Sequence, residues 1–259
     1  MSSQLVIEGL HVEVGGVLVL KGLDLSMRSG EVHVIMGPNG SGKSTLAHAL
    51  AGRPGYRVVS GTVTLDGVDL LGLTPTERAR AGLLLALQQP LEVPGVRPYD
   101  LLVAAGADPS GLRERMIDEA RRVELAPDVL DRFVNVDLSG GERKRAEMVQ
   151  VGVLRPRFAV LDEIDSGLDV DALRQVARRV AAAVHEPPPG APGLGVLAIT
   201  HYNRLLAELR PDAVHLLVNG RIVQSGDAGL AAEIERSGYG AYLPESAVPT
   251  RSALDDLFG

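Results

Sequence analysis

Hydrophobic positions in the first part of the chain follow strand patterns. Leu5 to Val14 and Val17 to Leu25 are rich in β-forming residues, and Gly15-Gly16 between them is typical of a hairpin turn. Residues 31–36 form a short apolar run that stops at a glycine, as a buried strand does. We therefore predict an antiparallel hairpin followed by a buried strand.

Further strand and helix signals follow. Residues 62–65 alternate before the turn pair Asp66-Gly67. Thr74-Pro75-Thr76-Glu77 has the pattern of a capping box with proline at the first helical position, which predicts the start of a helix. Leu83 to Leu87 then form an apolar run that predicts a second buried strand.

The pattern changes from about Pro90 to Asn135. This stretch is rich in Arg, Glu and Ala, is interrupted by prolines, and has helical periodicity from Leu112 to Val123. We interpret about residues 90–150 as a helical subdomain inserted into an α/β core.

Strands and helices alternate again from Gly141. The predicted elements are a helix to Val153, a strand at Phe158–Leu161, a helix at Asp171–Val184, a strand at Gly195–Thr200 and a hairpin turning at Asn219-Gly220. The proline-rich residues 187–193 predict an exposed loop. The pattern as a whole predicts an α/β protein with a mixed or parallel core sheet and an N-terminal antiparallel part. We expect one domain over residues 1–240 and a tail over 241–259.

Composition excludes several classes of function. The chain has 259 residues, no cysteine and a formal net charge of -7. The lack of cysteine excludes disulfides, thiolate metal sites and a cysteine nucleophile. The acidic balance argues against direct binding to nucleic acid or to anionic membranes. No apolar run approaches the ~18 residues of a membrane span, and the N-terminal residues lack a signal-peptide pattern. We expect a soluble, cytoplasmic protein.

A phosphate-binding loop follows the buried strand that ends at residue 36. The motif G-x-x-x-x-G-K-[ST] is matched at every specified position by Gly37, Pro38, Asn39, Gly40, Ser41, Gly42, Lys43 and Ser44, with Thr45 next. Glycines let backbone N–H groups converge on phosphate oxygens, and a following helix adds its positive end. Lys43 is expected to reach the β- and γ-phosphates, and the Ser44 hydroxyl to bind Mg²⁺. The alternative, an ordinary glycine-rich turn, does not account for the full match.

Two carboxylates end the apolar run 158–161. Such side chains lie at the ligand-binding edge of a parallel sheet. We expect Asp162 to hold Mg²⁺ through its water shell and Glu163 to polarise the attacking water.

Further motifs decide the family. They are Gln88, Leu138-Ser139-Gly140-Gly141-Glu142, Ser166-Gly167-Leu168-Asp169 and Thr200-His201. With the loop and the two carboxylates, they make the chain resemble the ATP-binding-cassette (ABC) ATPases to about Tyr239. The resemblance implies a P-loop NTPase of the ABC type that binds ATP. It also implies that two copies pair head to tail, each ATP lying between one phosphate loop and the other copy's Ser139, Gly140 and Gly141.

The resemblance also implies roles for single residues. Gln88 is expected to sense the γ-phosphate and Mg²⁺, completing a metal set with Ser44 and Asp162; Gln89 is the alternative. His201 is expected to stabilise the γ-phosphate and to form the catalytic set with Glu163 and Lys43. Asp169 is expected to position the dimer junction. Val14 stands where the family usually has an aromatic residue against adenine, and no aromatic residue precedes Tyr56, so we expect modest nucleotide affinity.

Several stretches are similar to one branch of this family, the ATPases of the SUF iron–sulfur cluster assembly machinery. They are residues 88–96, 135–145, 162–169, 200–206 and 214–223. This similarity implies a cytosolic motor that joins the scaffold proteins SufB and SufD. Two alternatives are the ATP-binding subunit of an ABC transporter and a nucleotide-dependent module without hydrolysis. Without cysteine or a histidine–carboxylate cluster, the chain itself is not expected to hold an iron–sulfur cluster.

Two hypotheses concern regulation and docking. A basic side chain near Lys144 could pair with Glu163 or Asp165 in the absence of nucleotide, the alternative being a solvated helix face. The apolar, proline-rich segment from Gln88 to Tyr99 is expected to contact the partner, the alternative being a loop folded against its own helical subdomain.

Overall fold

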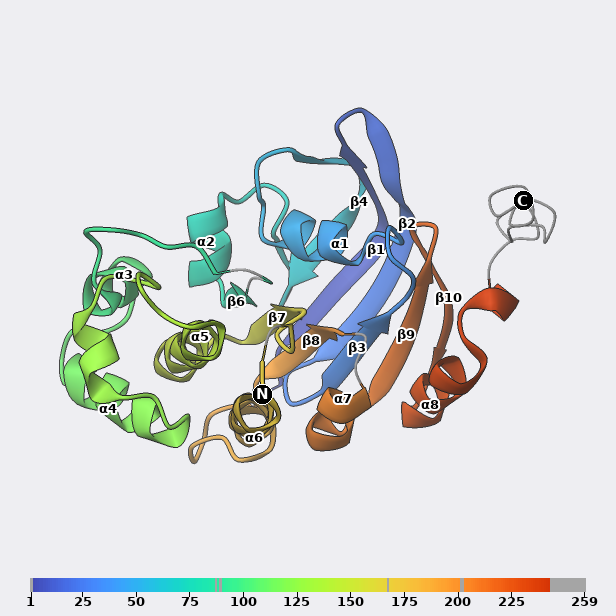
Figure 1. Ribbon diagram of the computed structural model, residues 1–259. Helices are drawn as coiled ribbons and strands as arrows, with labels where there is room; N and C mark the ends of the chain where they lie inside the picture. Colours follow the sequence, from blue (N-terminus) through green and yellow to red (C-terminus); the bar gives the residue numbers. More distant parts are fainter. Residues whose placement is uncertain (1, 87, 89, 167, 201–202, 243–259) are drawn as a thin grey trace, which may run out of the picture.

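Two sheets form the framework of the protein in the computed structural model, which describes residues 2–86, 88, 90–166, 168–200 and 203–242. The first sheet is antiparallel, in the order β2-β1-β4-β5, and the second has the order β10-β9-β3-β8-β7-β6 (Figure 1). The strands are β1 (Gln4–Val14), β2 (Val17–Arg28), β3 (Val32–Met36), β4 (Tyr56–Leu65), β5 (Val68–Asp69), β6 (Leu83–Ala86), β7 (Phe158–Asp162), β8 (Gly195–Ile199), β9 (Ala213–Val218) and β10 (Arg221–Gly226). Five neighbouring strands of the second sheet are parallel, and only β10 pairs antiparallel at its edge.

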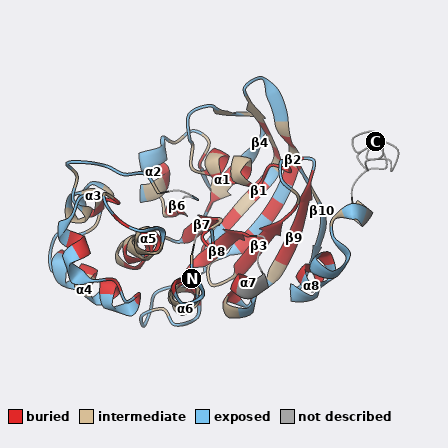
Figure 2. Ribbon diagram, viewed as in Figure 1, coloured by how far each residue is buried: buried red, intermediate tan, exposed pale blue. Residues whose placement is uncertain are grey.

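Two apolar clusters hold the layers together. In the first, α1 (Lys43–Leu50) packs its Leu46 and Leu50 between the two sheets, against Ile35 and Ile199 among others. In the second, α6 (Val170–His185), α7 (Asn203–Leu209) and α8 (Ala228–Ser237) cover the opposite face of the six-stranded sheet. Figure 2 shows the central strands buried between these layers. Strands buried on both faces explain the continuous apolar runs in the sequence.

A helical subdomain is inserted between β6 and β7. It consists of α3 (Pro98–Ala104), α4 (Leu112–Arg122), the 3₁₀ helix η1 (Pro127–Asp131) and α5 (Gly140–Leu154). In Figure 1 these helices lie beside the sheets rather than on them. An isolated bridge between Val93 and Val134 ties the segment that enters this subdomain to the segment between η1 and α5.

Local chemistry accounts for the helix starts. Thr74 forms the expected capping box with Glu77 at the start of α2 (Pro75–Arg80), and Ser139 forms a second one with Glu142 at the start of α5. Such reciprocal bonds satisfy backbone N–H groups that have no partner within the helix. The helix predicted from Gly141 therefore starts one residue earlier, behind its Ser139 cap.

The predicted boundaries differ from the observed ones by a few residues elsewhere. The second strand runs on to Arg28 rather than ending at Leu25, and β8 ends at Ile199 rather than Thr200. The alternating stretch 62–65 is the end of a longer strand that starts at Tyr56. The helices α3, α7 and α8 have weaker sequence signals and were not predicted. No helix in the described part of the chain is long and apolar enough to span a membrane.

A pair of buried histidines joins the two strands that flank the phosphate loop. His33 of β3 and His215 of β9 share a hydrogen bond of 3.0 Å, and His215 also bonds to Ser225 of β10 at 2.8 Å. Burial lowers the pKa of His215 to about 4 from its ordinary value of 6.5, with a further contribution from the charge of His33. Burial also lowers the pKa of His33, against the opposing effect of Glu31. Both rings are therefore neutral in the folded protein at pH 7.

We expect stability to fall on acidification through this pair. Between pH 6.5 and about 4 the unfolded chain binds a proton at His215 that the folded chain does not. The lowered pKa of His215 corresponds to about 3 kcal/mol of unfolding free energy, since one pKa unit is about 1.4 kcal/mol. That contribution is complete above pH 6.5 and is lost as the pH falls to 4. Urea unfolding of the wild type and of His215→Gln from pH 4 to 7.5 measures it, and an equal pH slope in both would contradict the assignment.

Candidate nucleotide site

The predicted site residues gather at the carboxyl ends of the parallel strands. Gly37 follows β3, Gln88 follows β6 by two residues, and Asp162 and Glu163 stand at the end of β7. Thr200 follows β8. Ligands of open α/β sheets bind at this edge, because the loops that leave neighbouring strands meet there.

The phosphate loop needs its glycines for space. A Cβ on Gly37 would lie 2.1 Å from the carbonyl oxygen of Leu217, and one on Gly42 would lie 2.7 Å from the side chain of Leu20. Gly42 also has a positive φ of 109° just before α1. The loop is thus pressed against β9 and β2, with the N-terminus of α1 at its end. This cradle leaves room only for backbone, as a phosphate-binding loop requires.

Lys43 and Ser41 are the buried polar groups of this loop. Lys43 is 6% exposed, and its Nζ donates to the carbonyl oxygens of Gly37 at 2.8 Å and Pro38 at 3.0 Å. Burial lowers the pKa of Lys43, and the carboxylates of Glu163 and Asp162 oppose that shift. The Ser41 hydroxyl is buried and has no hydrogen-bond partner among the described residues. The loop therefore presents a cation and an unsatisfied hydroxyl, which fits a polyphosphate.

Ser44 and Asp162 meet across the sheet edge. The Ser44 hydroxyl donates to Oδ1 of Asp162 at 3.3 Å, and Asp162 is 1% exposed. Burial raises the pKa of Asp162, with a smaller rise from the charge of Glu163, whereas the Ser44 hydrogen bond and the charges of Lys144 and Lys43 lower it. A hydroxyl and a carboxylate at this separation are hard oxygen ligands of the kind that Mg²⁺ prefers.

Glu163 takes an unusual backbone conformation and contacts Gln88. Its φ is +46°, and its backbone N–H donates to the carbonyl of Ile199 at 2.9 Å. The Gln88 amide Nε2 donates to Glu163 Oε2. The two residues therefore come together across 75 positions of sequence, in the arrangement expected of a water-polarising carboxylate beside a γ-phosphate sensor. Their roles stay predictions, and Gln89 lies outside the described residues.

The N-terminus of α5 is the place where the sequence predicts a second anion site. Ser139 and Gly140 are exposed, and the Ser139 hydroxyl both accepts from the backbone N–H of Glu142 at 3.3 Å and donates to its carboxylate at 2.7 Å. The helix of 15 residues directs its positive end outward. Its role in binding ATP held by a second copy stays a prediction.

Other predicted residues have defined places. Asp169 caps α6 by accepting from the backbone N–H of Ala172 at 2.7 Å. His201 lies outside the described residues, but Thr200 before it is fully buried and donates to the carboxylate of Asp165. Sequence reasoning did not assign that last contact, which joins the loop after β7 to the end of β8.

Val14 and Tyr56 turn out to be neighbours. They are paired across β1 and β4, so the first aromatic residue of the chain stands beside the position expected to support adenine. The Tyr56 ring packs against His48, with ring centroids 4.8 Å apart. The two residues are 42 positions apart in the sequence, and the pairing of β1 with β4 brings them together. A local sequence pattern does not indicate such a pairing.

Lys144 is buried, so it does not belong to the solvated helix face considered as an alternative. It is 2% exposed, and its Nζ lies 3.2 Å from Oε2 of Glu147, one helical turn away. The hypothesis that a basic group here pairs with Glu163 or Asp165 stays a prediction.

This geometry defines a P-loop NTPase, and comparisons with known proteins identify its family. A family model described as ABC transporter matches residues 20–166. Vegetative protein 296 of Bacillus subtilis is 44% identical over 247 residues, which cover 92% of each chain. The probable ATP-dependent transporter SufC of Escherichia coli is 44% identical, covering 90% of this chain and 96% of that protein. A dimeric ATP-binding cassette bound to ADP and phosphate shares the fold, with a TM-score of 0.73 and 19% identity over 86% of this chain and 98% of the other.

The chain therefore belongs to the ABC transporter family. It is an ABC-type ATPase that resembles SufC, and its fold is the α/β cassette with antiparallel part and helical insertion predicted above.

Proposed function

We propose that this protein is the ATP-hydrolysing motor of a SUF-type iron–sulfur cluster assembly complex, acting in the cytoplasm on a SufB–SufD scaffold. The observation that carries the proposal is the 44% identity to SufC along nearly the whole length of both chains. The Ile164-Asp165 pair supports it. The pair belongs to residues 162–169, one of the stretches similar to the SUF ATPases, and it is built into the site because Ile164 is fully buried and Asp165 bonds to Thr200.

The chain's own residues supply the parts of an ATPase. Backbone N–H groups of the loop 37–45 and the Nζ of Lys43 bind the phosphates, and Lys43 exchanges its bonds to the Gly37 and Pro38 carbonyls for phosphate oxygens. Ser44, Asp162 and Gln88 would hold Mg²⁺, which neutralises charge on the phosphates when bound. Glu163 would orient and polarise the attacking water, and His201, which lies outside the described residues, is assigned to the γ-phosphate by the resemblance to the family.

The site is completed by a second copy of the chain. The exposed α5 N-terminus, with Ser139, Gly140 and Gly141, would cover the γ-phosphate held by the other copy. ATP would then hold two copies head to tail, and hydrolysis would release them. A transient dimer of this kind can move a scaffold that is attached to both copies.

A transporter subunit is the second candidate, since the E. coli relative is named a probable ATP-dependent transporter. Affinity purification of the tagged chain from its own organism separates the two. The proposal expects SufB and SufD to co-purify in comparable amounts. Recovery of a membrane-spanning subunit in their place would contradict it.

The segment from Gln88 to Tyr99 is the proposed contact with the scaffold. Its backbone is tied to the helical subdomain, because Val93 N–H donates to Val134 and Val134 N–H donates to Val96, both at 2.9 Å. Its side chains nevertheless face outward, with Leu91 66% and Val93 38% exposed. The backbone of the segment is thus folded against its own subdomain, while its side chains are exposed to a binding partner. The hydrogen bond from Gln88 connects the segment to Glu163.

We expect Val93→Asp to weaken scaffold binding by a few kcal/mol, because an unpaired carboxylate would be buried in the interface. Basal ATPase activity and thermal stability should not change, since the Val93 side chain is exposed and its backbone bonds remain. Calorimetric titration with SufB–SufD measures the loss, with Val223→Asp on the exposed edge strand β10 as the matched control. Wild-type affinity in Val93→Asp would place the contact elsewhere.

A further inference from the structure

Helix α6 contacts the helical subdomain through polar side chains on one of its faces. Helix α5 packs against both α6 and α4, so it lies where the subdomain meets the core (Figure 1). Gln175 and Arg179 of α6 stand four residues apart, about one helical turn, and therefore lie on the same face of the helix. Each of them bonds to residues of the subdomain.

The side chain of Gln175 joins three elements. Its Oε1 accepts from the guanidinium of Arg145 in α5 at 3.0 Å, and its Nε2 donates to Oε2 of Glu124, in the turn after α4, at 2.5 Å. The guanidinium can only donate and the carboxylate only accepts, so an amide, which does both, fits between them in one orientation. We call these two bonds the Gln175 clasp.

Arg145 connects the Gln175 clasp to the start of α5. Its Nε donates to the carbonyl oxygen of Gly141 at 3.3 Å. A Cβ on Gly141 would lie 3.7 Å from the Cβ of Ala172, so the first turns of α5 and α6 are in contact. Ala172 is also the residue whose backbone N–H bonds to Asp169, the cap of α6. The predicted anion site and Asp169 therefore lie at two neighbouring helix starts, and the clasp joins these helices about one turn further on.

A buried ion pair holds α5 in a second place. Nε of Arg179 donates to Oε2 of Glu119 in α4 at 2.7 Å, and Glu119 is 6% exposed. The pair passes close over α5 at Gly152, where a Cβ would lie 2.1 Å from the same carboxylate oxygen. Helix α5 is thus held to α6 at two positions, of which the Gln175 clasp is the one close to residues 139–141.

The orientation of the first turn of α5 matters for the dimer described above. Residues 139–141 would bind phosphate held by the second copy, and Asp169 is expected to lie at the same junction. Groups that are already fixed relative to one another lose less freedom when they bind together. A link between α5 and α6 close to both helix starts therefore favours association of the two copies.

We propose that Gln175 is a positioning residue for the ATP-bound dimer, holding the first turn of α5 on α6 so that residues 139–141 and Asp169 meet the second copy together. The inference rests on the proposed function, because it concerns the head-to-tail dimer. Gln175 acts through its bonds to Arg145 and Glu124.

The test is the dimerisation constant in ATP and Mg²⁺, measured by sedimentation equilibrium in Glu163→Gln so that ATP is not consumed. Adding Gln175→Met removes both bonds and keeps an unbranched side chain with good helix propensity. Dimerisation should weaken by about tenfold or more, since one lost hydrogen bond costs about threefold per copy and two copies meet. Gln224→Met, the same change at an exposed position of β10, is the matched control and should dimerise as Glu163→Gln alone does. Affinity of the single copy for a fluorescent ATP analogue should be equal in all these proteins.

An exchanged pair separates the two bonds from the shape of the side chain. Gln175→Glu combined with Glu124→Gln exchanges donor and acceptor, and the carboxylate at position 175 can accept from both the amide and Arg145. In the Glu163→Gln background, this pair should restore dimerisation to within about twofold of Glu163→Gln alone, the spread expected when both hydrogen bonds are kept.

An unchanged dimerisation constant in the Gln175→Met protein would overturn the inference and leave the proposed function intact. A lower melting temperature without weaker dimerisation would do the same, because it would give Gln175 a structural role alone. Equal weakening in Gln175→Met and in the exchanged pair would show that the two bonds do not matter, which also overturns the inference. Failure of Glu163→Gln itself to dimerise with ATP would overturn both the inference and the proposed dimer.

Discussion

Glu163→Gln should abolish turnover while leaving ATP bound. The substitution keeps the size of the side chain and its contact with Gln88, whose amide can still donate to the new side-chain oxygen. It removes the carboxylate that we propose polarises the attacking water, and loss of such a group costs about 100-fold or more in rate. The substitution leaves Lys43 and the loop, the proposed phosphate ligands, unchanged, so nucleotide affinity should not fall.

The same variant should accumulate the ATP-bound dimer. Size-exclusion chromatography with ATP and Mg²⁺ should show a dimer for Glu163→Gln. The wild type should elute mainly as a monomer, because it hydrolyses its ATP. Glu186→Gln is the control, because it makes the same Glu-to-Gln change at an exposed residue just after α6. It should behave as the wild type does. Turnover near the wild-type rate in Glu163→Gln would show that another group polarises the water.

Lys43→Ala should lose nucleotide binding, a step before the hydrolysis that Glu163→Gln blocks. The side chain is 6% exposed and its ammonium already lies within the loop, so it reaches phosphate oxygens without a large movement. Hydrogen bonds to charged groups contribute about 1.5–3 kcal/mol, so affinity for ATP should fall about 10- to 100-fold.

Equilibrium binding of a fluorescent ATP analogue measures this effect. Arg53→Ala, which removes a cation at the other end of α1, should bind nucleotide as the wild type does. Circular dichroism of Lys43→Ala should match that of the wild type, which checks that the variant is folded. Unchanged affinity in a folded Lys43→Ala protein would contradict the placement of the phosphates in this loop.

Local chemistry made much of this fold predictable. The capping box at Thr74, the apolar runs of β3 and β7 and the glycine loop after β3 each have a short-range cause, and each was located within a few residues. The phosphate loop and the Asp162–Glu163 pair could be assigned because their chemistry requires particular residue types at fixed spacing.

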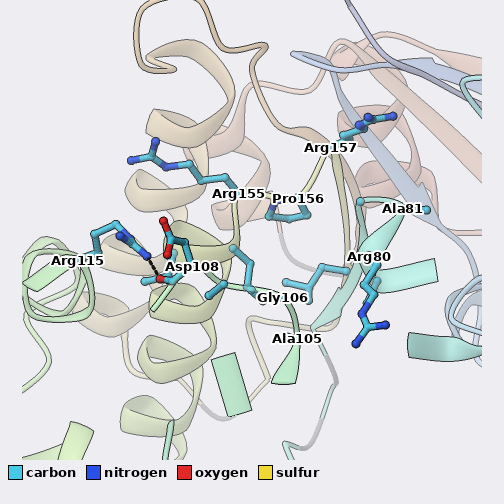
Figure 3. Close-up of a pocket in the computed structure, with 15 residues that line it drawn as sticks. Arg80, Ala81, Ala105, Gly106, Asp108, Arg115, Arg155, Pro156 and Arg157 are labelled. Carbon is cyan, nitrogen blue, oxygen red and sulfur yellow. Dashed lines mark hydrogen bonds between the residues drawn. The ribbon is translucent and has the colours of Figure 1, made fainter. Parts of the chain in front are cut away.

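Contacts between distant segments could not be predicted in the same way. The pairing of Val14 with Tyr56, the bond between Thr200 and Asp165 and the burial of Lys144 beside Glu147 depend on how strands and helices pack. A cavity of about 450 Å³ is another example, because the residues Arg80, Arg115 and Arg155 that line it come from α2, from α4 and from the turn after α5 (Figure 3). Only the three-dimensional structure shows that they surround one cavity.

The most direct test of the central claim is the ATPase rate of the purified chain as SufB–SufD is added. If the protein is the motor of that scaffold, the rate should rise with scaffold concentration and saturate at the affinity measured by calorimetry, and Glu163→Gln should show no rise. A rate that does not respond to SufB–SufD, in a preparation that hydrolyses ATP, would contradict the assignment to this machinery.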